Sequence, residues 1–203
     1  MALVFCGTFS ILAVSHDLGL LGVAVASGSA HVGDRVPHAK PGIGVIATQA
    51  YTNIVYGVKG LEMLRKGLSP TKALNKLLSG DSESEKRQVA IMDFKGRKAV
   101  FTGANVPAYS AEIVGKDYIV IGNSLSTENV AVHMAEAFES SSGNLALRLV
   151  KALEAGSKNG GDRRGEFSAA LRVISAEKVE VEIKVDFHEN PIEELFQKLK
   201  LQQ

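Results

Sequence analysis

Apolar and polar residues alternate along the chain with two different periods, and these periods predict where strands and helices lie. Short segments rich in apolar and β-branched residues are typical of strands. Two pairs of such segments are separated by the turn sequences Asp17-Leu18-Gly19 and Lys95-Gly96-Arg97, which predicts two hairpins. The predicted strands cover residues 8–14, 20–27, 42–49, 87–94, 98–102, 118–121, 167–174 and 179–187.

Segments in which apolar residues recur every three or four positions predict five helices. Ser69 and Pro70 are typical of a helix start, because serine caps free backbone N–H groups and proline fits the first helical turn. In the third helix, Val132, Ala135 and Phe138 are expected on one buried face. The predicted helices cover residues 56–66, 70–78, 128–140, 145–155 and 192–199, and Gly156 is expected to end the fourth.

The order of these elements predicts the α+β class. Strands come in hairpins and helices in pairs, which does not fit a regular parallel array of alternating strands and helices. A four-layer αββα sandwich of two mainly antiparallel sheets, with helices on the outer faces, would accommodate this order. Residues 20–26 are almost all apolar, as expected of a strand covered on both faces. We expect one domain over residues 1–203, with residues 1–7 as a leader and 189–203 as a C-terminal helix.

The composition is that of a globular protein, and it narrows the possible partners. Of 203 residues, 45% are hydrophobic and 22% charged, and the formal net charge is +1. We expect no binding to nucleic acid or to a membrane surface, because both need a basic excess. The longest apolar runs fall short of the roughly 20 residues that span a bilayer, and the N-terminus lacks the regions of a signal peptide. These observations predict a cytoplasmic protein.

Several common types of site find no support in the sequence. Cys6 is the single cysteine, which excludes an intrachain disulfide, and its apolar neighbours indicate a buried residue rather than a nucleophile. The five histidines lack the spacing of metal ligands, and the chain has no phosphate-binding loop of the Walker type. We therefore expect neither a metal ion nor a cofactor.

The pair Gly7-Thr8 stands at the head of the first predicted strand. A threonine hydroxyl is a weak nucleophile at neutral pH unless a base lies beside it. If the bond between Gly7 and Thr8 were cut, the new α-amino group, whose unperturbed pKa is roughly 7.7–8.0, would be that base. The alternative is that Thr8 is only a β-branched residue that begins a strand, and the residues alone favour this alternative.

A set of motifs extends over residues 8–192. They are Thr-Phe-Ser-Ile at 8–11, Gly-Val-Ala-Val-Ala-Ser at 22–27, Gly-Ile-Gly-Val-Ile-Ala-Thr-Gln-Ala at 42–50, Tyr-Gly-Val-Lys-Gly-Leu at 56–61, Arg-Gln-Val at 87–89, Gly-Asn-Ser-Leu at 122–125 and Gly-Gly-Asp-Arg-Arg-Gly-Glu-Phe-Ser-Ala-Ala at 160–170. With these motifs the chain resembles the domain-of-unknown-function 1028 family, of the Ntn-hydrolase-like (N-terminal nucleophile) superfamily. The resemblance implies the αββα fold.

A weaker resemblance, to Ntn hydrolases such as proteasome β subunits, implies roles for individual residues. Thr8 would be the nucleophile, and the charge of Lys40 would lower the pKa of Thr8. Asp162 and Ser168 would orient the amine of Thr8, and Asn123 or nearby backbone amides would receive the oxyanion. Because seven residues precede Thr8, a free Thr8 requires self-cleavage of the chain.

Four further residues are candidates for binding a substrate or ligand. Arg163 and Arg164 could clamp a carboxylate or phosphate, or could form a structural ion-pair cluster. Gln49 and Asn53 could be polar groups of a site, or could satisfy the local backbone. We expect an Ntn-type amidohydrolase acting on a small amide or peptide-like substrate. The alternative is a non-catalytic protein that binds a small anionic or peptide-like ligand, and in either case we expect a homodimer.

Overall fold

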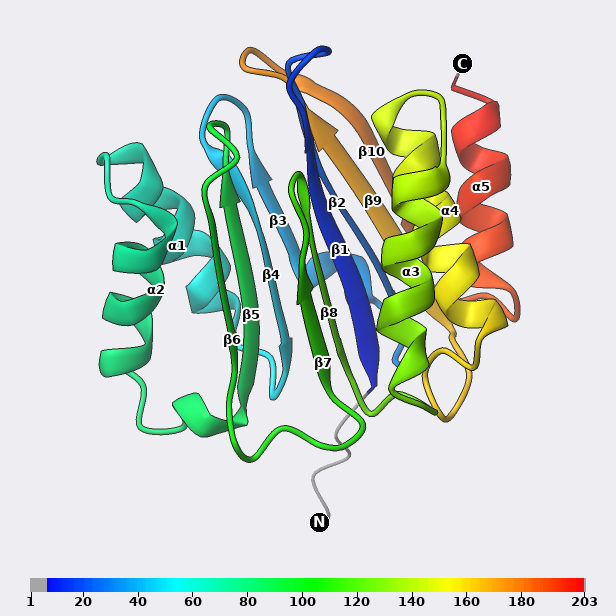
Figure 1. Cartoon of the computed structure of the whole chain (residues 1–203), viewed down its shortest axis with the longest axis horizontal. Helices are drawn as coiled ribbons and strands as arrows, with labels where there is room; N and C mark the ends of the chain where they lie inside the picture. Colours follow the sequence, from blue (N-terminus) through cyan, green and yellow to red (C-terminus); the bar gives the residue numbers. More distant parts are fainter. Residues whose placement is uncertain (1–6, 203) are drawn as a thin grey trace.

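The chain folds into four layers, in the order helices, sheet, sheet, helices (Figure 1). This arrangement, seen in a computed structural model that describes residues 7–202, confirms the predicted αββα sandwich. Residues 1–6 and 203 lie outside the described residues. The predicted leader, apart from Gly7, and the expected burial of Cys6 therefore also lie outside them.

The first sheet places the N-terminal strand at its centre. Within residues 7–202 its strand order is β10-β9-β2-β1-β8-β7, and all these neighbours are antiparallel. The strands are β1 (Thr8–Ser15), β2 (Leu20–Ser27), β7 (Ala111–Val114), β8 (Tyr118–Asn123), β9 (Ser168–Ile174) and β10 (Val179–Val185). The segments that meet in this sheet therefore come from both ends of the sequence.

The second sheet has the order β3-β4-β5-β6 among the described residues, again antiparallel. Its strands are β3 (Pro37–Lys40), β4 (Gly44–Ala50), β5 (Arg87–Asp93) and β6 (Lys98–Thr102). The sequence did not predict β3 or β7. Each has only four residues, which is too few to show an alternation of apolar and polar positions. Each also lies at the edge of its sheet, where it pairs with a single neighbouring strand.

Helices cover the outer face of each sheet (Figure 1). The second sheet is covered by α1 (Ile54–Arg65) and α2 (Pro70–Ser79), and the first by α3 (Asn129–Ser140), α4 (Leu145–Lys158) and α5 (Pro191–Lys200). Short 3-10 turns occupy Val32–Asp34 and Ser84–Lys86. Among residues 7–202, none of these helices combines the length and apolar character that crossing a membrane requires. The cytoplasmic location and the homodimer remain predictions.

Three apolar clusters lie between the four layers. One packs α1 and α2 on the second sheet, one fills the space between the sheets, and one packs α3, α4 and α5 on the first sheet. Leu12, Val25 and Met92 are fully buried members of the middle cluster. Because both sheets have both faces covered, their central strands read as nearly continuous apolar runs.

Two details of the helices differ from the predictions. Ala135 and Phe138 are buried as predicted, but Val132 is 42% exposed, because Val130 and Met134 complete the face of α3 that packs on the sheet. Gly156 does not end α4 but lies inside it, and the helix continues to Lys158. A β-carbon at Gly156 would lie 2.8 Å from Cγ of Met134, so the glycine allows α3 and α4 to pack closely.

A buried ion pair joins the second sheet to its helices. The Arg87 side chain donates from Nε to Oδ2 of Asp81 (2.8 Å), which also accepts from the Tyr56 hydroxyl (2.9 Å). The side chains of Arg87 and Asp81 are only 5% and 13% exposed. The hydrogen bond from Arg87 lowers the pKa of Asp81 to about 2, and burial raises the pKa of the Tyr56 phenol.

We expect Asp81→Asn to lower the free energy of unfolding by on the order of 2 kcal/mol at pH 7. Because the folded pKa of Asp81 lies below its unfolded value, the ion pair contributes fully above about pH 4 and is lost as the pH falls toward 2. Urea unfolding of the wild type should therefore show stability falling between pH 4 and pH 2, with a smaller fall in Asp81→Asn. Glu177→Gln, at an exposed position, is the control. Equal acid dependence in Asp81→Asn and wild type would contradict this prediction.

Candidate functional site

The layer between the sheets is apolar along most of its length but polar at the end where β1 begins. Thr8 lies opposite Ser27 of β2 and Asn123 of β8, and Ser27 lies opposite Ser168 of β9. Directly opposed residues of antiparallel strands point to the same face of a sheet. These four side chains therefore form one polar row across the first sheet, and each is at most 4% exposed.

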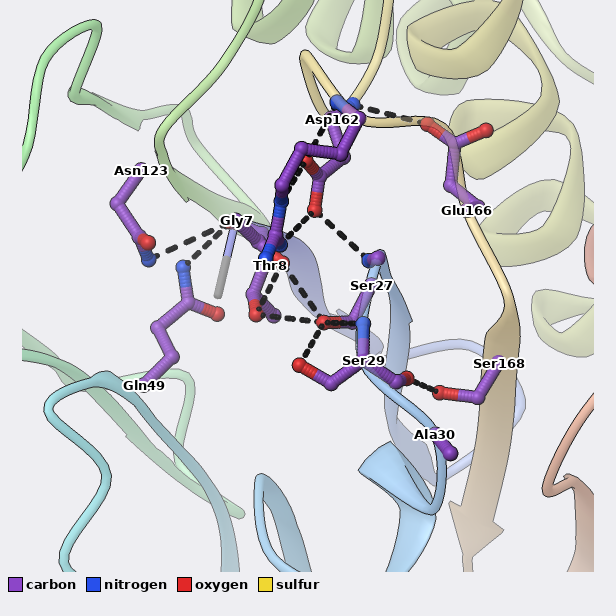
Figure 2. Close-up of polar contacts among 12 residues, drawn as sticks. Gly7, Thr8, Ser27, Ser29, Ala30, Gln49, Asn123, Asp162, Glu166 and Ser168 are labelled. Carbon is purple, nitrogen blue, oxygen red and sulfur yellow. Dashed lines mark hydrogen bonds and ion pairs between the residues drawn. The ribbon is translucent and has the colours of Figure 1, made fainter. Parts of the chain in front are cut away.

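The hydroxyls of Thr8 and Ser27 both point to the carbonyl oxygen of Gly7 (Figure 2). Each donates to this oxygen over 2.7 Å, and the two hydroxyl oxygens are 3.0 Å apart. Hydrogen bonds to a carbonyl oxygen stabilise the negative charge that develops there when a nucleophile attacks its carbon. Ser27 is thus a site residue that the sequence analysis missed. Its only signal was its place as the polar end of an apolar strand.

The carboxylate of Asp162 lies against Gly7 and is almost completely buried, at 2% exposure. Its Oδ2 accepts from the backbone N–H of Gly28 (2.7 Å) and from Nη2 of Arg164 (2.8 Å). Its Oδ1 accepts from the backbone N–H (3.0 Å) and Nε (3.1 Å) of Arg164. A buried carboxylate needs such partners to offset the loss of water. Arg164 therefore acts as the ion-pair partner of Asp162, the structural alternative that the sequence had left open.

Glu166 holds the loop that carries Asp162. Its Oε1 accepts from the backbone N–H of Asp162 (2.9 Å; Figure 2). Its Oε2 accepts from the Ser157 hydroxyl (2.8 Å). Gly161 has a φ of +50°, and a β-carbon there would lie 1.9 Å from Oε1 of Glu166. The loop can therefore approach Glu166 only with glycine at this position. No pattern in the sequence pointed to Glu166, a single acidic residue in a loop.

Side-chain amides connect the two sheets beneath Thr8. Gln49 of β4 donates from Nε2 to the Thr8 carbonyl (3.1 Å) and to Oε1 of Gln88 (2.8 Å), and its Oε1 accepts from Ser10 (2.6 Å). Asn123 donates from Nδ2 to the same Gln88 oxygen (3.1 Å). All four side chains are fully buried. The predicted candidates Gln49 and Asn123 thus belong to one network, with Gln88 of β5 at its centre.

Two buried oxygens at the end of β8, where Asn123 pairs with Thr8, accept no hydrogen bond from any described residue. They are Oδ1 of Asn123 and the hydroxyl oxygen of Ser124, and both residues are fully buried. Ser124 also has a φ of +49°, a left-handed conformation that is uncommon outside glycine. A buried polar atom without a partner costs about 1–3 kcal/mol. The site therefore has unused acceptor capacity next to Thr8.

The structure brings together some of the predicted residues at the Gly7–Thr8 bond. Thr8, Asn123, Gln49 and Asp162 all lie around it. Ser168 belongs to the polar row, but its hydroxyl accepts from the backbone N–H of Val32 (3.2 Å) and donates to the carbonyl of Ser29. Its hydrogen bonds thus hold the loop after β2, rather than Thr8.

Lys40 lies elsewhere. It is an exposed residue of β3 opposite Gly44, whereas Gln49, which reaches Thr8, lies five residues further along β4. Five residues of strand span about 16 Å, which is far beyond the length of a lysine side chain. The expected effect of Lys40 on the pKa of Thr8 is therefore corrected: lysine at this register position does not approach the hydroxyl.

Asn53 and Arg163 also lie apart from the polar row. The Asn53 side chain accepts from the backbone N–H of Val55 (3.1 Å) and so caps α1, which is the local alternative considered for this residue. Arg163 donates its backbone N–H to the carbonyl of Ser124 (3.2 Å), and the residue is exposed beside Asp162. Its guanidinium remains a candidate for binding an anionic group.

One group of potential metal ligands occurs among the described residues. His31, Asp34 and Asp186 are exposed, and one ligand atom from each lies within 4.8 Å of the others. The carboxylate of Asp34 already accepts a hydrogen bond from Nζ of Lys184 (2.6 Å), and this bond lowers the pKa of Asp34. The Lys184 ammonium group thus already forms an ion pair with one of the two carboxylates in this group.

A protein family matches the sequence of this chain, and solved structures resemble its fold to different degrees. The protein family described as "Family of unknown function (DUF1028)" matches residues 8–195. The crystal structure of protein SPO2555 from Silicibacter pomeroyi, also assigned to DUF1028, superposes with a TM-score of 0.90 at 34% identity, covering 96% of this chain and 88% of that one. Anbu (ancestral beta-subunit) from Yersinia bercovieri gives a TM-score of 0.45 at 9% identity, covering 96% and 93%. No curated protein matches.

We expect Gln88→Leu to lower the free energy of unfolding by about 2–4 kcal/mol, because it leaves one buried N–H bond of Gln49, one of Asn123 and the carbonyl of Gly122 without the partner that Gln88 supplies. Denaturant unfolding followed by circular dichroism measures this loss. Gln197→Leu, which makes the same change at an exposed position of α5, is the matched control and should shift stability by less than about 0.5 kcal/mol. Equal effects of the two changes would show that the network does not stabilise the sheets.

Proposed function

The chain belongs to the DUF1028 family of unknown function, and we propose that it acts as an Ntn-type amidohydrolase on small amide or peptide-like substrates. In this proposal Thr8 becomes the N-terminal residue through self-cleavage of the Gly7–Thr8 bond and then serves as the nucleophile. The observation that carries the proposal is the position of the Gly7 carbonyl. Its oxygen accepts from both the Thr8 and the Ser27 hydroxyl inside a buried site.

Self-cleavage would begin with attack of the Thr8 hydroxyl oxygen on the carbonyl carbon of Gly7. The C–N bond to Thr8 breaks, an ester to the Thr8 oxygen forms, and the hydroxyl proton moves to the Thr8 nitrogen. Water then hydrolyses the ester, which leaves a carboxylate on Gly7 and restores the hydroxyl. The Ser27 hydroxyl, 2.7 Å from the Gly7 oxygen, would stabilise the negative charge of the addition step.

The freed amino group would find acceptors in its surroundings. A terminal amine carries more N–H bonds than the peptide nitrogen it replaces, so it needs additional partners. Asn123 pairs directly with Thr8, and its Oδ1 and the adjacent Ser124 hydroxyl oxygen have no hydrogen-bond donor among the described residues. Oδ1 of Asn123 and the nearby Asp162 carboxylate would orient the amine as the general base for the hydroxyl.

The exposed guanidinium of Arg163 suggests where a substrate would bind. Arg163 follows Asp162 in the chain and is the exposed member of the pair of arginines, whereas Arg164 is used by the Asp162 carboxylate. We expect it to bind a carboxylate or another anionic group of the substrate.

Intact-mass spectrometry of the purified chain, before and after incubation at its working temperature, tests this function. We expect loss of residues 1–7 in the wild type and a stable full-length mass in Thr8→Ala, because alanine has no nucleophile. A β-lactone probe should label the processed wild type at Thr8 and leave Thr8→Ala unlabelled. Thr127→Ala, at an exposed threonine in the segment before α3, is the matched control and should behave as the wild type does.

A full-length mass that stays unchanged in the wild type would contradict the proposal and favour a non-catalytic ligand-binding protein. In that case anionic ligands should raise the melting temperature of the wild type, and Arg163→Ala should reduce this shift whereas Thr8→Ala should not.

A further inference from the structure

The space beside the α-carbon of Gly7 is already filled. A β-carbon built on Gly7 would lie 2.5 Å from Cγ, 2.5 Å from Oδ2 and 2.6 Å from Oδ1 of Asp162. All three distances are shorter than any real contact of a β-carbon, so the carboxylate occupies the volume that an L-side chain would need at this position.

The carboxylate cannot move aside easily. Four hydrogen bonds hold it, one from the backbone of Gly28 and three from Arg164. On its other side lies Gly28, where a β-carbon would be only 2.5 Å from Oδ2. Glu166 fixes the backbone of the same loop through the N–H of Asp162. The carboxylate is therefore confined between two glycine α-carbons, and rotating it would leave a buried charge without its partners.

We infer that Asp162 determines specificity: it restricts the acyl residue that Thr8 can attack to glycine. This inference rests on the proposed function, and it names the substrate class as amides of N-acylated glycine. Gly7 is the acyl residue of the self-cleavage step, and a substrate whose carbonyl takes the place of the Gly7 carbonyl would bring its α-carbon to the same carboxylate.

The reaction on such a substrate balances as an ordinary amide hydrolysis. The Thr8 hydroxyl oxygen adds to the glycyl carbonyl carbon, the C–N bond breaks, and the proton passes through the Thr8 amine to the leaving amine. Water then cleaves the glycyl ester and yields N-acylglycine with the free hydroxyl. With an L-alanyl substrate, the extra methyl group would meet the carboxylate before the carbonyl reached the Thr8 oxygen.

The experiment compares two substrates on the purified full-length chain after incubation, with intact mass recorded first. N-acetylglycyl p-nitroanilide should be hydrolysed with a kcat/KM about 10- to 100-fold higher than N-acetyl-L-alanyl p-nitroanilide, the ratio expected from overpacking of one methyl group.

In a second arm, Gly7→Ala should slow loss of residues 1–7 by a similar factor. Asp162→Ser, which shortens the side chain, should restore part of the cleavage in the Gly7→Ala background. Gly80→Ala is the matched control, because a β-carbon there would meet nothing closer than 3.7 Å.

The outcomes separate this inference from the function on which it rests. A wild type that keeps its full mass contradicts the proposed function and removes the inference with it. A processed chain that hydrolyses both substrates equally, or neither, overturns the inference alone. Cleavage of Gly7→Ala at the wild-type rate also overturns it, because the methyl group would then fit beside Asp162.

Discussion

Gln88 joins the two sheets at the place where the space between them loses its apolar character. Its side chain accepts from Gln49 of its own sheet and from Asn123 of the other, and it donates to the backbone carbonyl of Gly122 (2.9 Å). Without these bonds, several amide groups would be buried with no partner, at a cost comparable to a large part of the stability of a domain. The network therefore sets the relative position of the strands that carry Thr8 and its neighbours.

The same requirement explains the second part of the site. A carboxylate can be buried beside Thr8 only if cationic and N–H donors surround it, and Arg164, Gly28 and the loop held by Glu166 supply that environment. The glycines at 7 and 28 follow from this packing, since a side chain at either would collide with the carboxylate. The buried charge of Asp162, the conformation of its loop and the presence of glycine at positions 7 and 28 thus depend on one another.

The sequence predicted most of the architecture but only part of the site. Turn residues such as Asp17-Leu18-Gly19 and the cap Ser69 act locally, so the hairpin and helix that they mark are confirmed. The polar row could not be predicted in the same way, because the register that places Ser27 opposite Thr8 is a property of the folded sheet. Lys40 shows the opposite error: a basic residue near the expected strand falls at the wrong register position. Glu166 has no local signal at all, since its role comes from a loop that folds back on it.

The position of Thr8 in the centre of the first sheet has a consequence for the fate of a cut chain. Strand pairing begins at Thr8 on both sides, so a break at the preceding bond removes no backbone hydrogen bond of the ladder. The new end would not be a loose tail, because β1 pairs with β2 and with β8 from Thr8 onward. An aminopeptidase must bind several residues of extended chain in its own cleft. Here it could do so only after β1 had separated from β2 and β8. A terminus made in this way would resist trimming for as long as the sheet remained folded.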